Sequence, residues 1–96
     1  MVGFLDAAIW LDSETVAVWE KALPVSRKDP FWVRQDAHGN EIHREAYGNV
    51  TSPYGWQKDH VRPKALGGTD NISNLRPLNC RWNAMFGGIL GALLRK

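Results

Sequence analysis

The sequence predicts a small α+β domain in which a helix and a β-hairpin precede a second hairpin and a short helix. A strand-like run, GWQKDHVRP, leads through a loop with paired glycines into a second apolar run, NLRPLN, and then into a helical stretch. Upstream, Val16, Trp19 and Leu23 recur at helical spacing. A chain of 96 residues suits one domain with a core of modest size, so residues 1–96 are expected to fold together.

The first helix has a start and a stop in the sequence. Asp12 or Ser13 is placed to cap its N-terminus, and Glu14 in the first turn interacts favourably with the helix dipole. Pro24 is expected to end the helix, because proline removes a backbone donor and clashes with the preceding turn. Trp19 is expected to anchor the core.

A β-hairpin is expected next, with an extended stretch at residues 31–35, a polar turn AHGN and a return strand at residues 41–44. This hairpin contains His38 and His43, which one reading treats as a metal pair. No third ligand lies nearby in the sequence, so we interpret them as a turn residue and an outward-facing strand residue.

The second hairpin and its helix carry a group of chemically capable polar residues. Asp59 and His60 end the first strand, Asn74 opens the second, and Asn83 lies on the short helix. Taken singly, each is more often structural, since asparagines beside loops are usually turn residues. An acid, an imidazole and two amides in this joint order favour a metal-assisted active site. The Asn74 amide is expected to bridge backbone groups of the loop and so hold the His60 strand.

The stretch YGWQKDHVRPKALGGTDNISNLRPLNCRWN resembles the core of small bacterial and phage HNH endonucleases. In that family the core is a ββα-metal unit, a hairpin followed by a helix with a divalent ion between them, and here it would span residues 54–88. The resemblance implies that Asp59 ligates the metal, that His60 is the general base and that Asn74 is the structural asparagine of the catalytic site. Asn83 falls on the last motif position, in the asparagine (HNN) variant that completes the metal site.

These roles agree with what hydrolysis of a DNA phosphodiester bond requires: a base for water, a positive centre for developing charge, and groups that fix the phosphate. An imidazole with an ordinary pKa is largely neutral above pH 7 and accepts a proton from water. Neighbouring residues on a strand point to opposite sides, so Asp59 is expected to face the helix and the ion while His60 faces the attacking water. Oxygen donors from Asp59 and Asn83 favour Mg²⁺, with Mn²⁺ as a substitute. The expected products carry a 5′-phosphate and a 3′-hydroxyl.

Basic residues cluster inside the same motif, although the formal net charge of the chain is only +2. They are Lys58, Arg62, Lys64, Arg76 and Arg81. Considered alone, the cluster is explained about as well by a solvated face as by a nucleic-acid interface. Beside a nuclease-like site it predicts contacts to the DNA backbone with low sequence specificity, because no helix-turn-helix or zinc-finger reader is recognisable elsewhere.

Cys80 is the only cysteine, so the sequence offers neither an intramolecular disulfide nor the multi-cysteine zinc knuckle that many HNH proteins add. Two positions depart from the family pattern: Gln57 stands where many relatives have glutamate, and Phe86 stands where a lysine is common. Neither departure removes a predicted ligand or base. The helix is predicted to run from Cys80 to Phe86 with Asn79 as its N-cap, so Phe86 weakens the case for phosphate contacts late in the helix.

The two ends of the chain give weaker signals. Residues 1–11 are apolar with one acid and are compatible with a strand or a helix. They lack the basic start of a signal peptide, so a cytoplasmic location is expected. The apolar tail at residues 89–96 is too short to span a bilayer, and we interpret it as a packing helix or a homodimer contact rather than a membrane anchor.

Two other functions fit the sequence. One is a nucleic-acid-binding module that keeps the HNH fold without useful catalysis, although the retained Asp59, His60 and Asn83 argue against it. The other is an assembly subunit, for example of phage packaging machinery, that docks through its apolar tail.

Overall fold

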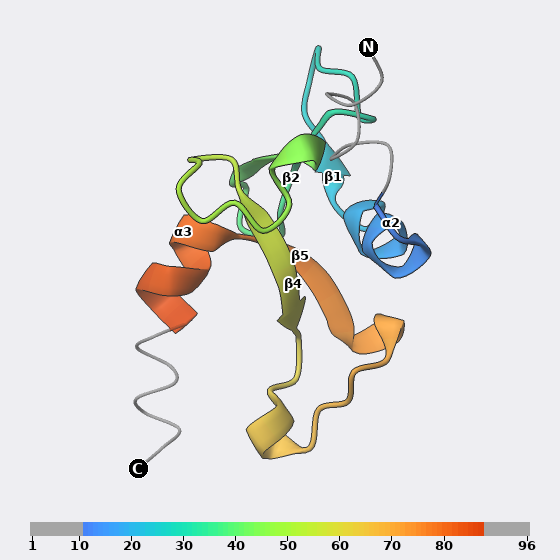
Figure 1. Ribbon diagram of the computed structural model, residues 1–96, viewed down its shortest axis with the longest axis vertical. Coiled ribbons are helices and arrows are strands. Elements are labelled where there is room, and N and C mark those ends of the chain that lie inside the picture. Colours follow the sequence, from blue (N-terminus) through green and yellow to red (C-terminus); the bar gives the residue numbers. More distant parts are fainter. Residues whose placement is uncertain (1–10, 88–96) are drawn as a thin grey trace.

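The computed structural model describes residues 11–87, which form an α+β arrangement with two small antiparallel sheets (Figure 1). In chain order the helices and strands are α2 (Ser13–Trp19), β1 (Leu23–Pro24), β2 (Val33–Gln35), β3 (Glu41–His43), β4 (Trp56–His60), β5 (Leu75–Asn79) and α3 (Cys80–Trp82). Short 3-10 turns occupy Arg44–Ala46 (η2), Lys64–Leu66 (η3) and Ile72–Asn74 (η4), and a π-helical turn, Asn83–Gly87 (η5), extends α3. The predictions for residues 1–10 and for the tail at residues 89–96 lie outside the described residues.

Helix α2 begins where the sequence predicted. Asp12 is the N-cap, and its carboxylate accepts a hydrogen bond from the Thr15 backbone N–H at 2.7 Å. Glu14 stands in the first turn. Trp19, the last residue of the helix, is fully buried, which confirms its predicted place in the core.

The predicted end of this helix at Pro24 is wrong. The helix ends at Trp19, and Pro24 belongs to β1, an edge strand paired with β2. The reason is a tertiary contact: the Arg34 guanidinium in β2 donates to the carbonyl of Glu20 at 3.0 Å, and so satisfies an acceptor that the last helical turn leaves open. Proline fits an edge strand because it has no N–H to offer a further neighbour.

The first predicted hairpin is confirmed, and its turn is tied to the second sheet. Strands β2 and β3 pair antiparallel, with Gly39 in the turn at φ +82°. The buried Asp36 accepts hydrogen bonds from the backbone N–H groups of His38 and Asn40. Its other oxygen accepts from the backbone N–H of Asn79, at the end of β5, at 3.0 Å. A single carboxylate therefore fixes the hairpin turn against the start of α3.

The second predicted hairpin is formed by β4 and β5, which pair antiparallel with Trp56 opposite Asn79 and His60 opposite Leu75. Asn79 then caps α3, as predicted, because its Oδ1 accepts from the backbone N–H groups of Arg81 and of the next residue. The helix was expected to continue as a regular α-helix to residue 86. Instead it changes to a π-helical turn at Asn83.

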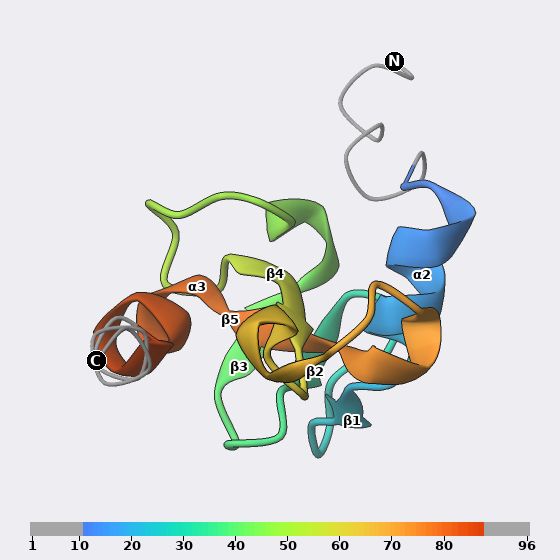
Figure 2. The same ribbon diagram turned by 90° about the horizontal axis from the view of Figure 1, so that it is seen from below.

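The core lies between α2 and the β4–β5 hairpin. Trp19 and Trp56 pack with their ring centroids 5.2 Å apart, and Val18, Ile42 and Leu75 surround them. In Figure 1 and in the view from below in Figure 2, α2 and α3 lie on opposite sides of this hairpin. Within residues 11–87, no helix has the length and apolar character needed to cross a bilayer.

Candidate active site

The candidate site lies where β4 ends and the loop to β5 begins. Asp59 and His60 are the last two residues of β4, opposite Arg76 and Leu75 in the register. Lys58, one residue earlier, reaches the α2 side, where its Nζ lies 2.7 Å from a carboxylate oxygen of Glu14. Because strand residues alternate, Asp59 faces away from α2 and His60 faces the same side as Lys58.

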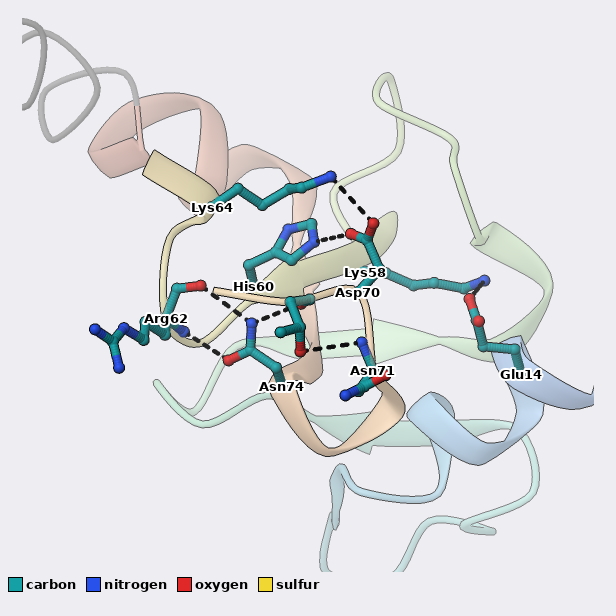
Figure 3. A network of polar contacts seen from close by, with 9 residues as sticks. Glu14, Lys58, His60, Arg62, Lys64, Asp70, Asn71 and Asn74 are labelled. Carbon is teal, nitrogen blue, oxygen red and sulfur yellow. Dashed lines mark hydrogen bonds and ion pairs between the residues drawn. The ribbon is translucent and has the colours of Figure 1, made fainter. Parts of the chain in front are cut away.

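His60 is held by an acidic residue from the loop. Its Nε2 lies 2.7 Å from Oδ1 of Asp70, and Oδ2 of Asp70 accepts from Nζ of Lys64 at 3.0 Å, so the carboxylate stands between the two side chains (Figure 3). The hydrogen bond with His60, followed by that with Lys64, lowers the pKa of Asp70. Within residues 11–87 no hydrogen bond engages the other ring nitrogen of His60, Nδ1.

The loop between β4 and β5 depends on two glycines for its tight closure. Gly67 has φ +90°, a conformation that L side chains rarely adopt. At Gly68 a Cβ atom would lie 1.7 Å from the carbonyl oxygen of Arg62, so only glycine fits this close approach. The Gly68 N–H donates to the Pro63 carbonyl at 2.9 Å. This tight closure carries the chain back toward His60.

Asn74 makes the backbone bridge that its position predicted. Its Oδ1 accepts from the Arg62 N–H at 2.9 Å, and its Nδ2 donates to the carbonyls of Arg62 at 3.1 Å and Thr69 at 2.8 Å (Figure 3). Both ends of the loop are thereby joined by one amide directly beyond His60.

The two predicted metal ligands are oxygen donors on neighbouring elements. Helix α3 lies beside the hairpin and runs in the same direction as β4 (Figure 1). With rises of about 3.3 Å per strand residue and 1.5 Å per helical residue, Asp59 lies about 10 Å beyond Trp56, and Asn83 about 6 Å beyond Asn79. Since Trp56 and Asn79 are opposite each other, these rises leave Asp59 about 4 Å farther along the hairpin toward the loop than Asn83.

The surroundings of these two donors differ. Asp59 Oδ2 accepts from Nε of Arg76 at 3.0 Å, and the side chains of this pair are 23% and 32% exposed. Asp59 Oδ1 and the partly exposed Asn83 amide form no hydrogen bond within residues 11–87. A carboxylate oxygen and an amide oxygen in this state fit a hard cation such as Mg²⁺, with Arg76 as a competitor for the carboxylate.

The predicted DNA-binding cations fall into two groups. Arg62, Lys64 and Arg81 are exposed, although Lys64 is also bonded to Asp70. Lys58 is instead paired with Glu14, with its side chain only 19% exposed. Burial opposes the charge of Lys58, but the hydrogen bond with Glu14 and neighbouring negative charges outweigh it and raise its pKa. Arg76 is paired with Asp59, as described above.

Two contributors escaped the sequence prediction. Asp70 was assigned no role from the sequence, because its contact with His60 depends on the closure of the loop. Lys21, just after α2, donates from Nζ to the carbonyls of Ile72 and, at 2.7 Å, Leu75. It thereby attaches the far end of the loop to the α2 side of the molecule, a contact with no local signal in the sequence.

The remaining histidines lie in the places predicted for them. His38 is exposed in the hairpin turn and stacks on Trp82 at 4.6 Å between ring centroids. His43 stacks on Tyr54 at 4.0 Å and bonds to the carboxylate of Glu41. Among residues 11–87, no three His, Cys, Asp or Glu side chains are grouped so that they could hold a metal ion.

Comparison with known proteins adds nothing to this geometry. No family model matches the chain, and neither the curated proteins nor the solved structures contain a significant match.

Proposed function

We propose that this protein is a metal-dependent HNH endonuclease that hydrolyses DNA phosphodiester bonds. The observation that carries the proposal is the arrangement at the end of β4. The His60 imidazole is hydrogen-bonded to a loop carboxylate through Nε2, and its Nδ1 has no partner among residues 11–87. The Asp59 carboxylate projects to the opposite side of the strand, and Asn74 joins the two ends of the loop by hydrogen bonds. This arrangement is compatible with a ββα-metal unit made of β4, β5 and α3.

In this proposal His60 acts as the general base. Its Nδ1 takes a proton from a water molecule, which attacks phosphorus in line with the leaving 3′-oxygen. Arg62 and Lys64, exposed on the same loop, hold the phosphate by charge. Asn74 keeps the base and these cations in a fixed relation, because it joins the backbone at Arg62 to that at Thr69.

Asp59 and Asn83 would hold a Mg²⁺ ion on the α3 side of the hairpin. When bound, the ion supplies a positive centre that stabilises charge developing on the phosphate and the leaving oxygen. Arg76 donates to one oxygen of Asp59 and so orients the carboxylate, leaving Oδ1 for the ion.

The direct test is cleavage of supercoiled plasmid by the purified chain with Mg²⁺, Mn²⁺, Ca²⁺ or Zn²⁺, each with and without EDTA. The proposal predicts relaxed or linear DNA with Mg²⁺ and Mn²⁺, abolished by EDTA, with 5′-phosphate ends that a ligase joins without prior phosphorylation. Intact plasmid under every metal condition would contradict it.

One observation favours the alternative of a binding module without catalysis. The Arg76 guanidinium already balances the negative charge of Asp59, so the carboxylate does not need a metal ion as its counter-charge. Calorimetry with Mn²⁺ separates the two functions: an endonuclease binds the ion, whereas a chain that binds duplex DNA without binding Mn²⁺ is a binding module.

A further inference from the structure

We infer that Asp70 is a positioning residue for His60, fixing the ring so that Nε2 carries the proton and Nδ1 faces the substrate side as the base. The inference rests on the proposed function, since it assigns a partner to the proposed general base. Nothing in the strand–loop–helix pattern of the motif assigns Asp70 this role.

The contact itself determines the tautomer. A carboxylate offers only acceptors, so a neutral His60 bonded to it at 2.7 Å must donate from Nε2. Lys64 bonds to the second oxygen of Asp70 at 3.0 Å, so the carboxylate is held from two sides although its side chain is 70% exposed. Both hydrogen bonds lower the pKa of Asp70, which therefore remains an acceptor at neutral pH.

The loop explains why an exposed aspartate keeps this place. Asn74 fixes the backbone at Thr69, the residue before Asp70, through the 2.8 Å hydrogen bond to its carbonyl. Gly67 and Gly68 close the preceding turn through conformations and contacts that other residues do not allow. The fixed backbone of the loop therefore places Asp70 beside His60.

The arrangement has a chemical consequence. When Nδ1 takes a proton from water, the remaining hydroxide forms the new P–O bond as the P–O3′ bond breaks, and the 3′-oxygen is protonated from solvent. The imidazolium produced in this step carries a positive charge beside the Asp70 carboxylate, which stabilises it and holds the ring in line. Removal of the carboxylate is therefore expected to slow the chemical step without weakening DNA binding.

The test begins with the metal-free protein. Nitrogen NMR of the His60 ring compares wild type with Asp70→Ala and Asp70→Asn, at a pH high enough that further increase changes no shift. Asp29→Asn is the matched control, since Asp29 is an exposed acid that caps only its own turn at Phe31. The inference predicts the shifts of a pure Nε2–H tautomer in wild type and in Asp29→Asn. Asp70→Ala should move both ring nitrogens toward the averaged values of free imidazole, and Asp70→Asn, which keeps an acceptor, should move them less.

Kinetics with Mg²⁺ supply the second readout. Asp70→Ala and Asp70→Asn should lower kcat by about tenfold or more with KM unchanged, a smaller loss than the roughly 10²–10⁴-fold contribution of a general base. Lys64→Ala should instead raise KM. A wild-type chain that cleaves no DNA overturns the proposed function. A wild type that cleaves, with Asp70→Ala cleaving at the same rate or showing the same ring shifts as wild type, overturns this inference alone.

Discussion

At the scale of single residues, Asn74 is the side chain on which the site most depends. It makes hydrogen bonds to Arg62 N, Arg62 O and Thr69 O. Asn74→Ala removes all of them, and because these hydrogen bonds lie at the surface we expect a loss of about 0.5–1.5 kcal/mol in the free energy of unfolding, together with lower activity. Urea denaturation measures this loss of stability, with Asn71→Ala as the control for removal of an exposed neighbouring amide. An Asn74→Ala chain as stable as wild type but inactive would place Asn74 in the chemistry instead.

The two proposed metal donors are tested by the ion alone. Asp59→Ala and Asn83→Ala should each weaken Mn²⁺ binding in calorimetry, because each removes an oxygen ligand. His60→Ala should bind Mn²⁺ as wild type does, since the imidazole is assigned as base and not as ligand. If Asp59→Ala and Asn83→Ala both bound the ion with wild-type affinity, the proposed metal site would be wrong.

At the scale of elements, the N-cap of α2 gives the fold a specific acid sensitivity. Hydrogen bonds from Thr15 lower the pKa of Asp12 below its ordinary value of 3.8. The cap therefore contributes fully above that value and is lost as pH falls through the lower pKa of the folded protein. Asp12→Ala should lower Tm by several degrees at pH 7. Asp12→Asn should nearly keep the neutral Tm and lose less of it on acidification. If Tm fell equally with pH in wild type and in Asp12→Asn, the Asp12 carboxylate would not be the source of the acid sensitivity.

The starts of the helices could be predicted from the sequence, because an N-cap contacts residues only two or three positions ahead. The end of α2 could not, because it is set by a tertiary contact. Asp12 and Asn79 cap through residues two or three positions ahead, so the sequence alone contains the signal. The end of α2 depends on Arg34, fourteen residues after the carbonyl it satisfies. The same division holds in the candidate site. The Asn74 bridge follows from its place beside the loop, whereas the contact between His60 and Asp70 requires the loop to be closed first.

At the scale of the whole molecule, the exposure of the cations predicts how DNA affinity in the proposed function responds to salt. Lys58 and Arg76 are partly buried and paired with acids, whereas Arg62, Arg81 and the Asp70-bonded Lys64 are exposed and remain for phosphate contacts. At about −0.9 per phosphate neutralised, the log–log slope of affinity against salt should be about −2 to −3 and similar for unrelated duplexes. Fluorescence anisotropy of a His60→Ala chain over a salt series measures it.

Two matched variants in that background separate the groups of cations. Arg62→Gln should flatten the salt slope by roughly one unit, while Lys58→Gln should leave it unchanged. Equal flattening by both would show that Lys58 leaves Glu14 to contact DNA. A strong preference for one duplex would point to a base-reading surface and against purely electrostatic binding.

The measurement that tests the central claim most directly is plasmid cleavage with Mg²⁺ by His60→Ala beside wild type and His38→Ala. His38 is an exposed turn histidine, so its variant controls for loss of an imidazole elsewhere. The account predicts that His60→Ala loses roughly 10²–10⁴-fold in cleavage rate, with an unchanged circular dichroism spectrum, while His38→Ala cleaves at the wild-type rate. Cleavage by His60→Ala at the wild-type rate would contradict the assignment of this histidine as the base.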